Sequence, residues 1–254
     1  MHHIMFNLFK KAPTLKDYSF LGVDLHSHLL PGIDDGAKNL DKSLELIREL
    51  QQLGFRKLIT TPHVMNDLYT NTPETILDSF DAVTNAIQEN PDITVDFHTA
   101  AEYLLDDGFG DKLHNGELLA LPGRRVLVEM SFLSAPPNLE QYIFRLQTKG
   151  YTPLLAHPER YLFLREDFKK YHELKERGCE FQLNILSLTG YYGQPVKENG
   201  FHLLKEGLID FLGTDLHHQQ HAKFLRAALE DTHIAKAVRK MEFKNAELAV
   251  SNGH

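Results

Sequence analysis

Short apolar runs rich in β-branched residues alternate along this chain with longer segments whose apolar positions recur every three or four residues. The first pattern is typical of buried strands, and the second of helices packed on one face. The alternation occurs seven times. The predicted strands are Leu21–Asp24, Lys57–Thr61, Ile93–Thr99, Arg125–Glu129, Thr152–Ala156, Glu180–Ile185 and Ile209–Gly213.

Capping residues mark where the intervening helices begin and end. Asn39 offers an N-cap to a helix that Gly54 ends. Thr72 and Pro73 are typical of an N-cap and a first helical position. The stretch 104–123, rich in Gly and Asp, predicts a long loop with one short helix. The other predicted helices are 73–89, Leu139–Thr148, Glu166–Arg177, Val196–Lys205 and one from about Ala222.

Seven strand–helix units in a row predict parallel strands with helices packed outside them. Right-handed crossovers leave an open doubly wound sheet or a closed barrel. An open sheet gathers chemistry at one switch point, whereas a barrel gathers it from the C-terminal ends of many strands. Six of the seven predicted strands end in His or a carboxylate, which favours the barrel. We expect a TIM-like α/β barrel over residues 21–254, preceded by an N-terminal arm over residues 1–20.

The polar strand ends have the composition of a metal site. Side chains alternate in an extended segment, so His26 and His28 point the same way and can hold one ion, as can Asp215 and His217. Imidazole and carboxylate without thiolate favour manganese, iron or zinc over a structural zinc site. Nine ligands exceed the coordination of one ion, so two or three divalent ions are implied. The nine candidates are His26, His28, Asp34, His63, Glu102, Glu129, His157, Asp215 and His217.

Each of these residues taken alone has an ordinary structural interpretation. A buried strand Glu is usually an ion-pair partner, and a strand-end Asp is usually a helix cap. The coincidence across six strands favours the metal site, whose chemistry would be to activate water and clamp a phosphoryl group. Most other histidines, including His98 and His202, are expected to be packed or on the surface. His218 and His221 follow the last strand closely enough to contact a substrate.

Charge and composition exclude other classes of function. The net charge is −8 and no long basic run occurs, which disfavours nucleic-acid binding. The single Cys179 cannot form an internal disulfide and lacks the phosphate-binding loop of a cysteine-dependent phosphatase. No apolar run approaches the length of a membrane span, so no stable membrane insertion is expected. Residues 1–11 are too interrupted for a signal peptide and predict a frayed end or a surface-seeking arm. The expected compartment is the cytoplasm.

Several motifs resemble one known family. They are Asp24-Leu25-His26-Ser27-His28-Leu29-Leu30-Pro31-Gly32-Ile33-Asp34-Asp35-Gly36, Thr61-Pro62-His63, Glu102-Tyr103, Glu129, Ala156-His157-Pro158-Glu159-Arg160 and Asp215-Leu216-His217. At these residues the chain resembles the PHP (polymerase and histidinol phosphatase) superfamily. Within it, the chain is similar to the bacterial tyrosine-protein phosphatases that act beside capsule and exopolysaccharide tyrosine kinases.

This resemblance implies a distorted (β/α)7 barrel with three ions, manganese being expected ahead of iron or zinc. The implied first ion is held by His26, His28, Glu102 and Asp215. The second shares Glu102 and adds Glu129 and His157, and the third uses Asp34, His63 and His217. Asp34 is preferred to Asp35 because of its spacing from His26.

The reaction that the resemblance implies is hydrolysis of a phosphomonoester by metal-activated water, on phosphotyrosine proteins such as a bacterial tyrosine kinase. Arg160, His157 and Asp215 are the expected catalytic residues, with Arg160 as the phosphate clamp. Arg160 could instead pair with Glu159 or another carboxylate. This branch commonly has a second arginine soon after the last D-x-H, but none stands there in this chain. Its substrate-binding substitutes are His218, His221, Lys223 or Arg226.

Other functions remain open from the sequence. A small-molecule phosphatase, such as a histidinol-phosphate phosphatase, is the closest alternative on the same barrel. A non-catalytic metal-binding module and a nuclease are further ones, disfavoured by the intact ligand set and the acidic balance. Aromatic side chains near the barrel mouth could guide a phosphotyrosine tail. The candidates by position are Tyr103, Phe132, Tyr161, Tyr191 and Tyr192.

Overall fold

A computed structural model describes residues 14–249. All of its named strands pair in parallel. Two of the predicted strands are each followed, after a break at Thr61-Pro62 and at Ala100-Ala101, by a further short strand that was not predicted. The strands are β1 Val23–Asp24, β2 Lys57–Thr60, β3 His63–Val64, β4 Asp96–Thr99, β5 Glu102–Leu104, β6 Arg125–Glu129, β7 Thr152–Ala156, β8 Glu180–Asn184 and β9 Phe211–Gly213.

The strands form a ring that the breaks distort. One sheet has the order β1-β2-β4 and the other has the order β3-β5-β6-β7-β8-β9. The two ends of the ring meet where the Asp215 amide donates to the His26 carbonyl at 2.7 Å and the His28 amide donates to the Leu216 carbonyl at 2.9 Å. Ser27 and Leu216 pair there as a parallel bridge. The predicted distorted, TIM-like α/β barrel is thereby confirmed.

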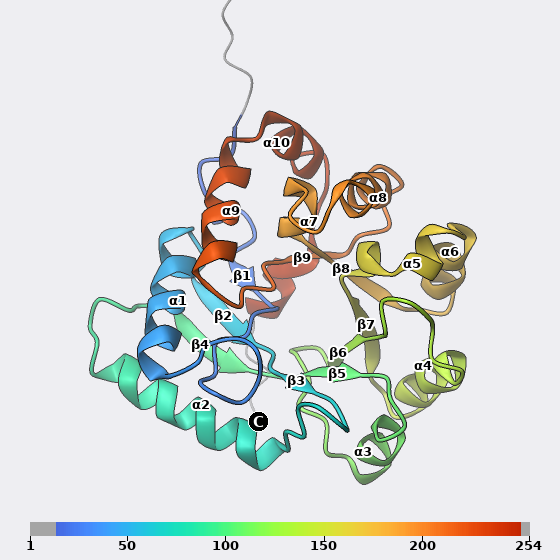
Figure 1. The fold of residues 1–254 in the computed structure, drawn as a ribbon, viewed down its shortest axis with the longest axis horizontal. Helices are drawn as coiled ribbons and strands as arrows, with labels where there is room; N and C mark the ends of the chain where they lie inside the picture. The colour runs from blue at the N-terminus through green and yellow to red at the C-terminus, as the bar shows by residue number, and fades with distance from the viewer. Residues whose placement is uncertain (1–13, 250–254) are drawn as a thin grey trace, which may run out of the picture.

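Helices surround the strands on the outside (Figure 1). The predicted caps are confirmed, since the side chains of Asn39 and Thr72 accept from the amides of Lys42 and Thr75. The helices are α1 Leu40–Gln52, α2 Pro73–Gln88, α3 Phe109–Asn115, α4 Leu139–Thr148, α5 Leu162–Arg165, α6 Lys169–Glu176, α7 Ile185–Thr189, α8 Gln194–Lys205, α9 Gln219–Glu230 and α10 Thr232–Val238, with 3-10 turns η1 Pro158–Arg160 and η2 Lys244–Ala249.

Two helix predictions need correction. The segment 166–177 is a helix only over α6, because α5 ends before it and a turn separates the two. The last strand is followed by helix already at Gln219, three residues before the predicted start, with His218 in extended conformation as its N-cap residue. The predicted short helix in 104–123 is α3.

Apolar side chains fill the ring itself and the layer between ring and helices. The interior residues are Val23, Leu25, Ile59, Ala100, Leu121, Leu127, Leu154, Ala156, Phe211 and Leu248. Leu248 comes from η2, whose Asn245 side chain also bonds to the Val23 carbonyl and to both backbone groups of Leu212. The C-terminal turn therefore closes the end of the barrel at which the strands begin.

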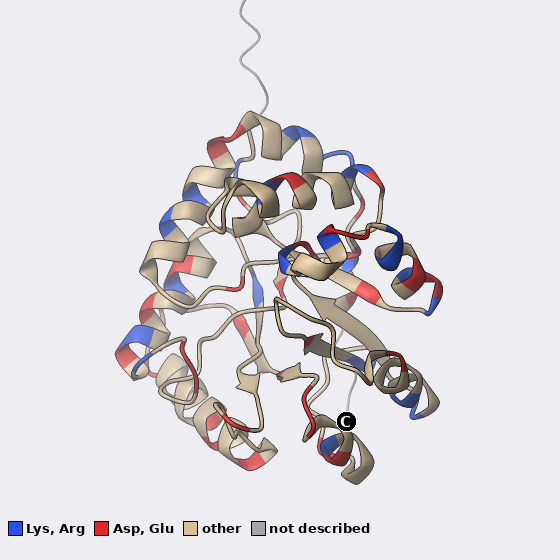
Figure 2. Cartoon of the chain, turned by 45° about the vertical axis from the view of Figure 1, so that its right-hand side comes forward, with Lys and Arg blue, Asp and Glu red and all other residues tan. Residues whose placement is uncertain are grey.

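The outer surface has mixed charge, with Lys and Arg interspersed among Asp and Glu along the helices in the view of Figure 2. Cys179 is buried, and burial raises the pKa of its thiol to about 12, so the thiol stays protonated at neutral pH. This agrees with the exclusion of a cysteine nucleophile.

Part of the predicted N-terminal arm packs onto the barrel. Tyr18 is buried, and its hydroxyl donates to the Leu225 carbonyl of α9 at 2.8 Å. The residues 1–11, for which a frayed end or a surface-seeking arm is predicted, lie outside the described part. Between residues 14 and 249, none of the helices has the length and apolar character of a membrane span.

Candidate metal centre

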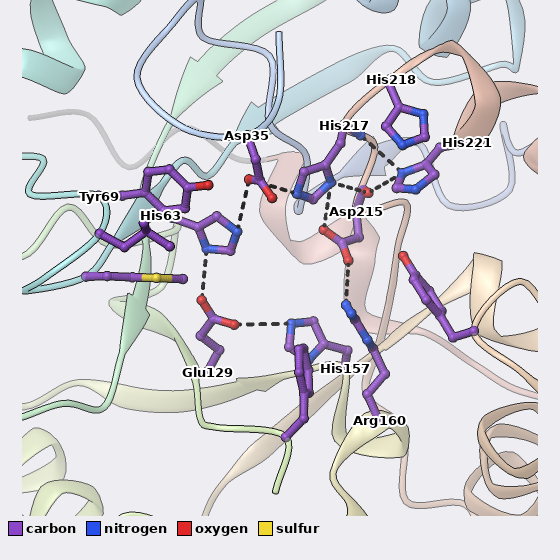
Figure 3. A pocket seen from close by; sticks show the side chains of 14 residues that line it. Asp35, His63, Tyr69, Glu129, His157, Arg160, Asp215, His217, His218 and His221 are labelled. Carbon is purple, nitrogen blue, oxygen red and sulfur yellow. Dashed lines mark hydrogen bonds and ion pairs between the residues drawn. The ribbon is translucent and has the colours of Figure 1, made fainter.

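The C-terminal ends of the strands meet at a pocket of about 380 Å³, shown in Figure 3. Its wall is built from the strand ends and from the loops that follow them. Side chains from both parts point toward one another across the pocket (Figure 3). The lining includes Asp35, His63, Glu129, His157, Arg160, Asp215 and His217.

Glu102, fully buried at the start of β5, is the central carboxylate of this centre. Its Oε2 lies 3.1 Å from His26 Nε2, 3.5 Å from His28 Nε2 and 3.2 Å from His63 Nδ1. Its Oε1 lies 3.1 Å from His157 Nε2. A carboxylate placed among four imidazoles in this way can bridge two cations, as the sequence predicted for Glu102.

The loops after β7 and β9 hold their ligand candidates in an unusual backbone conformation. His157 has φ 36° and Asp215 has φ 51°, in the left-handed region that residues other than glycine rarely adopt. Arg124 is the third such residue in the described chain. Strained backbone of this kind gathers at functional sites, where the surrounding structure has to maintain it. The strain turns both side chains into the pocket.

Some buried polar atoms of the cluster lack a hydrogen bond of ordinary geometry in the described part of the chain. His63 Nδ1 and Glu129 Oε1 lie 2.8 Å apart, but neither finds a hydrogen-bond partner among the described residues. His157 Nδ1 is also buried without a partner there. Buried polar atoms are nearly always satisfied in folded proteins, so such atoms need an explanation. Cations held by this cluster would give these buried atoms a partner.

The adjacent residues Asp34 and Asp35 have different positions. Asp34 Oδ2 accepts from His28 Nδ1 at 2.7 Å and from the His63 amide at 3.2 Å. Asp35 reaches into the pocket instead, with Oδ1 3.5 Å from His63 Nε2 and 3.4 Å from His217 Nε2. The structure thus brings Asp35 together with the two histidines of the predicted third ion, and places Asp34 behind His28.

A second layer of polar side chains orients these histidines and Asp215. His26 Nδ1 lies 2.7 Å from Gln182 Oε1, and His217 Nδ1 lies 2.9 Å from the Asp215 carbonyl. Asn184 Nδ2 donates to Asp215 Oδ2 at 2.6 Å. Such outer partners fix the ring orientation of ligating histidines and raise their basicity. The second ring nitrogen of His26 is left facing Glu102, and that of His217 is left facing Asp35.

Gln182 and Asn184 were missed by sequence reasoning. They belong to β8, which is the one predicted strand without a terminal His or carboxylate. The sequence signal that could have revealed them is a pair of amide side chains at positions i and i+2 of the buried strand Glu180–Asn184. Their shared direction toward the barrel axis follows from the strand period.

The electrostatics of the cluster couple imidazoles to carboxylates. Burial alone would lower the pKa of His26, but Glu102 and Asp215 outweigh it and raise that pKa to about 9. Burial would likewise raise the pKa of Glu102 and Asp215, and the surrounding histidines hold both pKa values well below their usual range. The imidazoles and carboxylates of the cluster thus stabilise one another as opposite charges.

The donor set fits divalent metal ions. Four groups each bring their ligand atoms within 4.8 Å of one another. They are His28–Asp35–His63–His217, His26–His28–Glu102, His26–His157–Asp215 and His63–Glu102–Glu129. All of the candidate ligands predicted from the sequence except Asp34 belong to at least one group. Nitrogen and carboxylate oxygen are the donors that manganese, iron and zinc accept in reactive sites.

Arg160 stands beside this cluster at the pocket wall. Its Nη1 donates to Asp215 Oδ2 at 3.3 Å, while Glu159 turns away and accepts from Ser187 and the Asn184 amide. The pairing with Glu159 that the sequence left open is therefore not the one observed. The carboxylate partner of Arg160 is Asp215, and the guanidinium still lines the pocket.

The candidates for a second phosphate contact separate into two groups. His218 and His221 line the pocket. Lys223 is exposed on α9 and is not among the lining residues, and Arg226 donates to Glu49 and Gln52 outside the pocket. The difference arises because α9 starts directly after His218, so its first turn faces the pocket and its later residues turn away.

The aromatic candidates also separate. Tyr103 and Tyr161 are buried in the core, whereas Phe132 and Tyr192 line the pocket together with Tyr69. Tyr191 lies behind Tyr192 and packs against His221. His98 pairs with Asp96 at the surface, and His202 stacks on Phe168, so both have the structural roles expected of them.

Fold and site together define an α/β barrel with a candidate metal centre in the pocket at its mouth. A family model described as "Capsular polysaccharide synthesis, CpsB/CapC" matches residues 22–250. The chain belongs to the CpsB/CapC family.

Relatives within this family carry phosphatase names. The tyrosine-protein phosphatase YwqE of Bacillus subtilis is 32% identical over 203 residues, which are 80% of each chain. The tyrosine-protein phosphatase CpsB of Streptococcus pneumoniae is 28% identical over 77% of this chain and 82% of its own.

Solved structures agree with this. One of them comes from a study of YwqE from Bacillus subtilis and CpsB from Streptococcus pneumoniae, which calls them "unique metal-dependent tyrosine phosphatases". It matches this chain with a TM-score of 0.74 and 29% sequence identity, and the match covers 87% of this chain and 96% of that one. A histidinol phosphate phosphatase from Lactococcus lactis has a TM-score of 0.50 and 15% identity, covering 85% of this chain and 94% of that one, and shares the fold.

Proposed function

We propose that this protein is a metal-dependent phosphatase that hydrolyses phosphotyrosine in proteins. The observation that carries the proposal is the arrangement of Arg160 beside a cluster of five histidines and several carboxylates at one barrel mouth. The metal dependence and the tyrosine-phosphatase names of YwqE and CpsB support it.

The residues would divide among three ions as follows. His26, His28, Glu102 and Asp215 hold the first. Glu102, Glu129 and His157 hold the second, and Asp35, His63 and His217 hold the third. Asp35 replaces Asp34 in this assignment because Asp35 lies with both histidines, whereas Asp34 orients His28. Manganese is the proposed metal, with iron and zinc as alternatives.

When bound, such ions activate water and neutralise the charge of a phosphoryl group. The protein's own groups supply the rest. The Arg160 guanidinium binds phosphoryl oxygens, since its planar fork matches their geometry. Asp215 and Asn184 form a chain of hydrogen bonds that holds Arg160 next to the cluster. His218 and His221 complete the wall opposite, where the family's second arginine is missing.

The rim of the pocket favours a polypeptide over a small alcohol phosphate. Leu68 and Phe132 line the mouth and are 68% and 39% exposed, and neighbouring Leu133 is 76% exposed. Exposed apolar groups gathered at a pocket are typical of protein contact surfaces. A bacterial tyrosine kinase is the proposed substrate, and the cytoplasm is the proposed compartment.

The decisive experiment compares two substrates on one sample. The protein, loaded with manganese and analysed for metal content, is assayed against a phosphotyrosine peptide and against histidinol phosphate. We expect turnover of the peptide only. Cleavage of histidinol phosphate alone would make the small-molecule reaction the correct one.

Arg160→Ala is expected to lower kcat/KM for the peptide by about 10²- to 10³-fold, since one charged contact to the transition state is lost. Arg226→Ala is the matched control, because Arg226 bonds to Glu49 outside the pocket. Equal losses in the two variants would contradict the role of Arg160.

A further inference from the structure

The guanidinium of Arg160 lies between two aromatic rings. Its Cζ is 4.3 Å from the centre of the Phe132 ring and 4.2 Å from the centre of the Tyr192 ring. Both distances are within the range of cation–π attraction. We propose that Phe132 and Tyr192 are positioning residues that hold Arg160 in one plane before a phosphoryl group arrives. This inference rests on the proposed function, in which Arg160 is the phosphate clamp.

The two rings come from different loops and are themselves anchored. Phe132 follows β6, and its carbonyl accepts from the Leu162 amide at 2.9 Å. Its ring stacks on buried Tyr161, with the ring centres 5.8 Å apart and the planes at 28°. Tyr192 follows α7 and packs edge-on against Tyr191 at 5.0 Å. The rings therefore form two fixed walls rather than two mobile covers.

The walls suit the geometry of a guanidinium. All of its N–H groups point outward in its plane, and its two faces carry none. Rings that attract the guanidinium through their π-faces therefore restrain it without using any of its donors. Arg160 Nη1 donates a hydrogen bond to Asp215, and the Arg160 side chain makes no other hydrogen bond within residues 14–249. The remaining in-plane donors stay available for phosphate oxygens.

Without the walls, the same arginine would have competing positions. Its side chain is 21% exposed and has several rotatable bonds, and the carboxylates of the cluster lie close by. Ordering such a side chain during binding costs conformational entropy that a preorganised site avoids. The rings would reduce this cost, so their effect should be seen in phosphate affinity as well as in turnover.

A different role would give a different result. If the rings only stacked on the phenyl group of the substrate, they would affect aryl phosphates and leave inorganic phosphate unaffected. Inorganic phosphate has no ring, and it still needs Arg160. Binding of inorganic phosphate to the metal-loaded protein, measured by calorimetry, therefore separates the two roles.

The test uses Tyr192→Leu and Phe132→Leu, with the ring-retaining Tyr192→Phe and Phe132→Tyr as matched controls. We expect each Leu variant to weaken phosphate binding and to lower kcat/KM for an aryl phosphate by about 5- to 30-fold, as loss of a partly buried cation–π contact implies. The ring-retaining variants should stay within about twofold of the wild type. In an Arg160→Ala background, Tyr192→Leu should cause no further loss.

Unchanged phosphate affinity in both Leu variants would overturn the inference, as would a full further loss in the Arg160→Ala background. Thermal unfolding and metal content are measured for every variant, and if one Leu variant folds poorly the other decides. Wild-type protein that neither binds phosphate nor hydrolyses an aryl ester would instead overturn the proposed function itself. If the wild type binds phosphate and hydrolyses the aryl ester, and the Leu variants bind phosphate as tightly as the wild type, only the positioning role of the rings is overturned.

Discussion

The two adjacent aspartates Asp34 and Asp35 show that a shift of one residue position changes which side chain reaches the candidate metal centre. From the sequence, Asp34 and Asp35 were equivalent except for spacing, and the spacing favoured Asp34. In the structure the turn at Pro31–Gly36 directs Asp34 back to His28 and Asp35 out to His63 and His217. The direction of a side chain in an irregular turn depends on backbone angles that no periodicity encodes. The two roles lead to different predictions.

Asp35→Ala is expected to bind one divalent ion fewer per chain, because a ligand of the third ion is removed. Asp34→Ala should keep the number of ions and bind them about 10- to 100-fold more weakly, as loss of an outer partner of a ligating histidine does. Elemental analysis and metal titration measure both quantities. The reverse result would restore Asp34 as the ligand.

Gly36 occupies a position where no side chain fits. A Cβ built there would lie 2.2 Å from the His28 carbonyl oxygen and 2.5 Å from its Cβ. Gly36→Ala should therefore displace the turn that holds both aspartates, and destabilise the protein by about 1–3 kcal/mol in urea unfolding. Gly110→Ala in α3 is the control, because its added Cβ meets the tip of the Arg145 side chain at 3.1 Å and Tyr142 Cε1 at an ordinary contact distance of 3.6 Å. Similar effects of the two changes would contradict this account.

At the scale of elements, the sequence predicted most of the strands and helices and the side chains that their regular geometry brings together. Strand and helix periods located the ring, and the strand ends located the candidate ligands, because parallel strands bring their carboxyl ends together. The breaks at Pro62 and Ala100 were not predictable, since they depend on how adjacent strands distort to close the ring. The outer layer from Gln182 and Asn184 was also missed, because their importance arises from what lies opposite them.

Asp210 links three elements and gives a pH dependence to their packing. It pairs with Lys175 of α6 and, at 2.9 Å, with Lys244 of η2, and accepts from the Phe181 amide of β8 at 2.8 Å. Burial alone would raise the pKa of Asp210, but these bonds outweigh it and lower the pKa. The stabilisation is thus present above the unfolded pKa of about 3.9 and is lost as the pH falls through the lower folded pKa.

We accordingly expect Asp210→Asn to reduce the free energy of unfolding by about 1–3 kcal/mol at pH 7 and pH 5. The difference from the wild type should shrink as the pH falls below about 4. Urea unfolding at several pH values measures it. A difference that grows toward acidic pH would show that Asp210 does not act through its charge.

At the scale of the whole molecule, the barrel depends on joining its first strand to its last. Asp24 is fully buried and accepts from the Thr214 amide and hydroxyl, both at 2.9 Å. His26 and His28 follow one of these strands, and Asp215 and His217 follow the other. The same junction therefore holds both the ring and four of the nine candidate ligands in register.

Thr214→Val removes one bond to a buried carboxylate while keeping the side-chain volume. We expect a loss of about 1–3 kcal/mol in unfolding free energy, together with weaker metal binding. Thr148→Val is the matched control, since the Thr148 hydroxyl bonds locally at the exposed end of α4. Intact metal affinity in Thr214→Val would mean that the junction does not set the ligand positions.

The junction also bears on how the chain comes to be folded. Asp24 and Thr214 are 190 positions apart, and Asn245 of η2 bonds to Val23, 222 positions away. Contacts so distant in sequence form slowly, because a long loop has to close before they contribute. During synthesis the N-terminal histidines emerge long before their partners at the other end of the chain. The candidate metal centre can therefore be completed only after the segment that carries Asp215 and His217 has been synthesised.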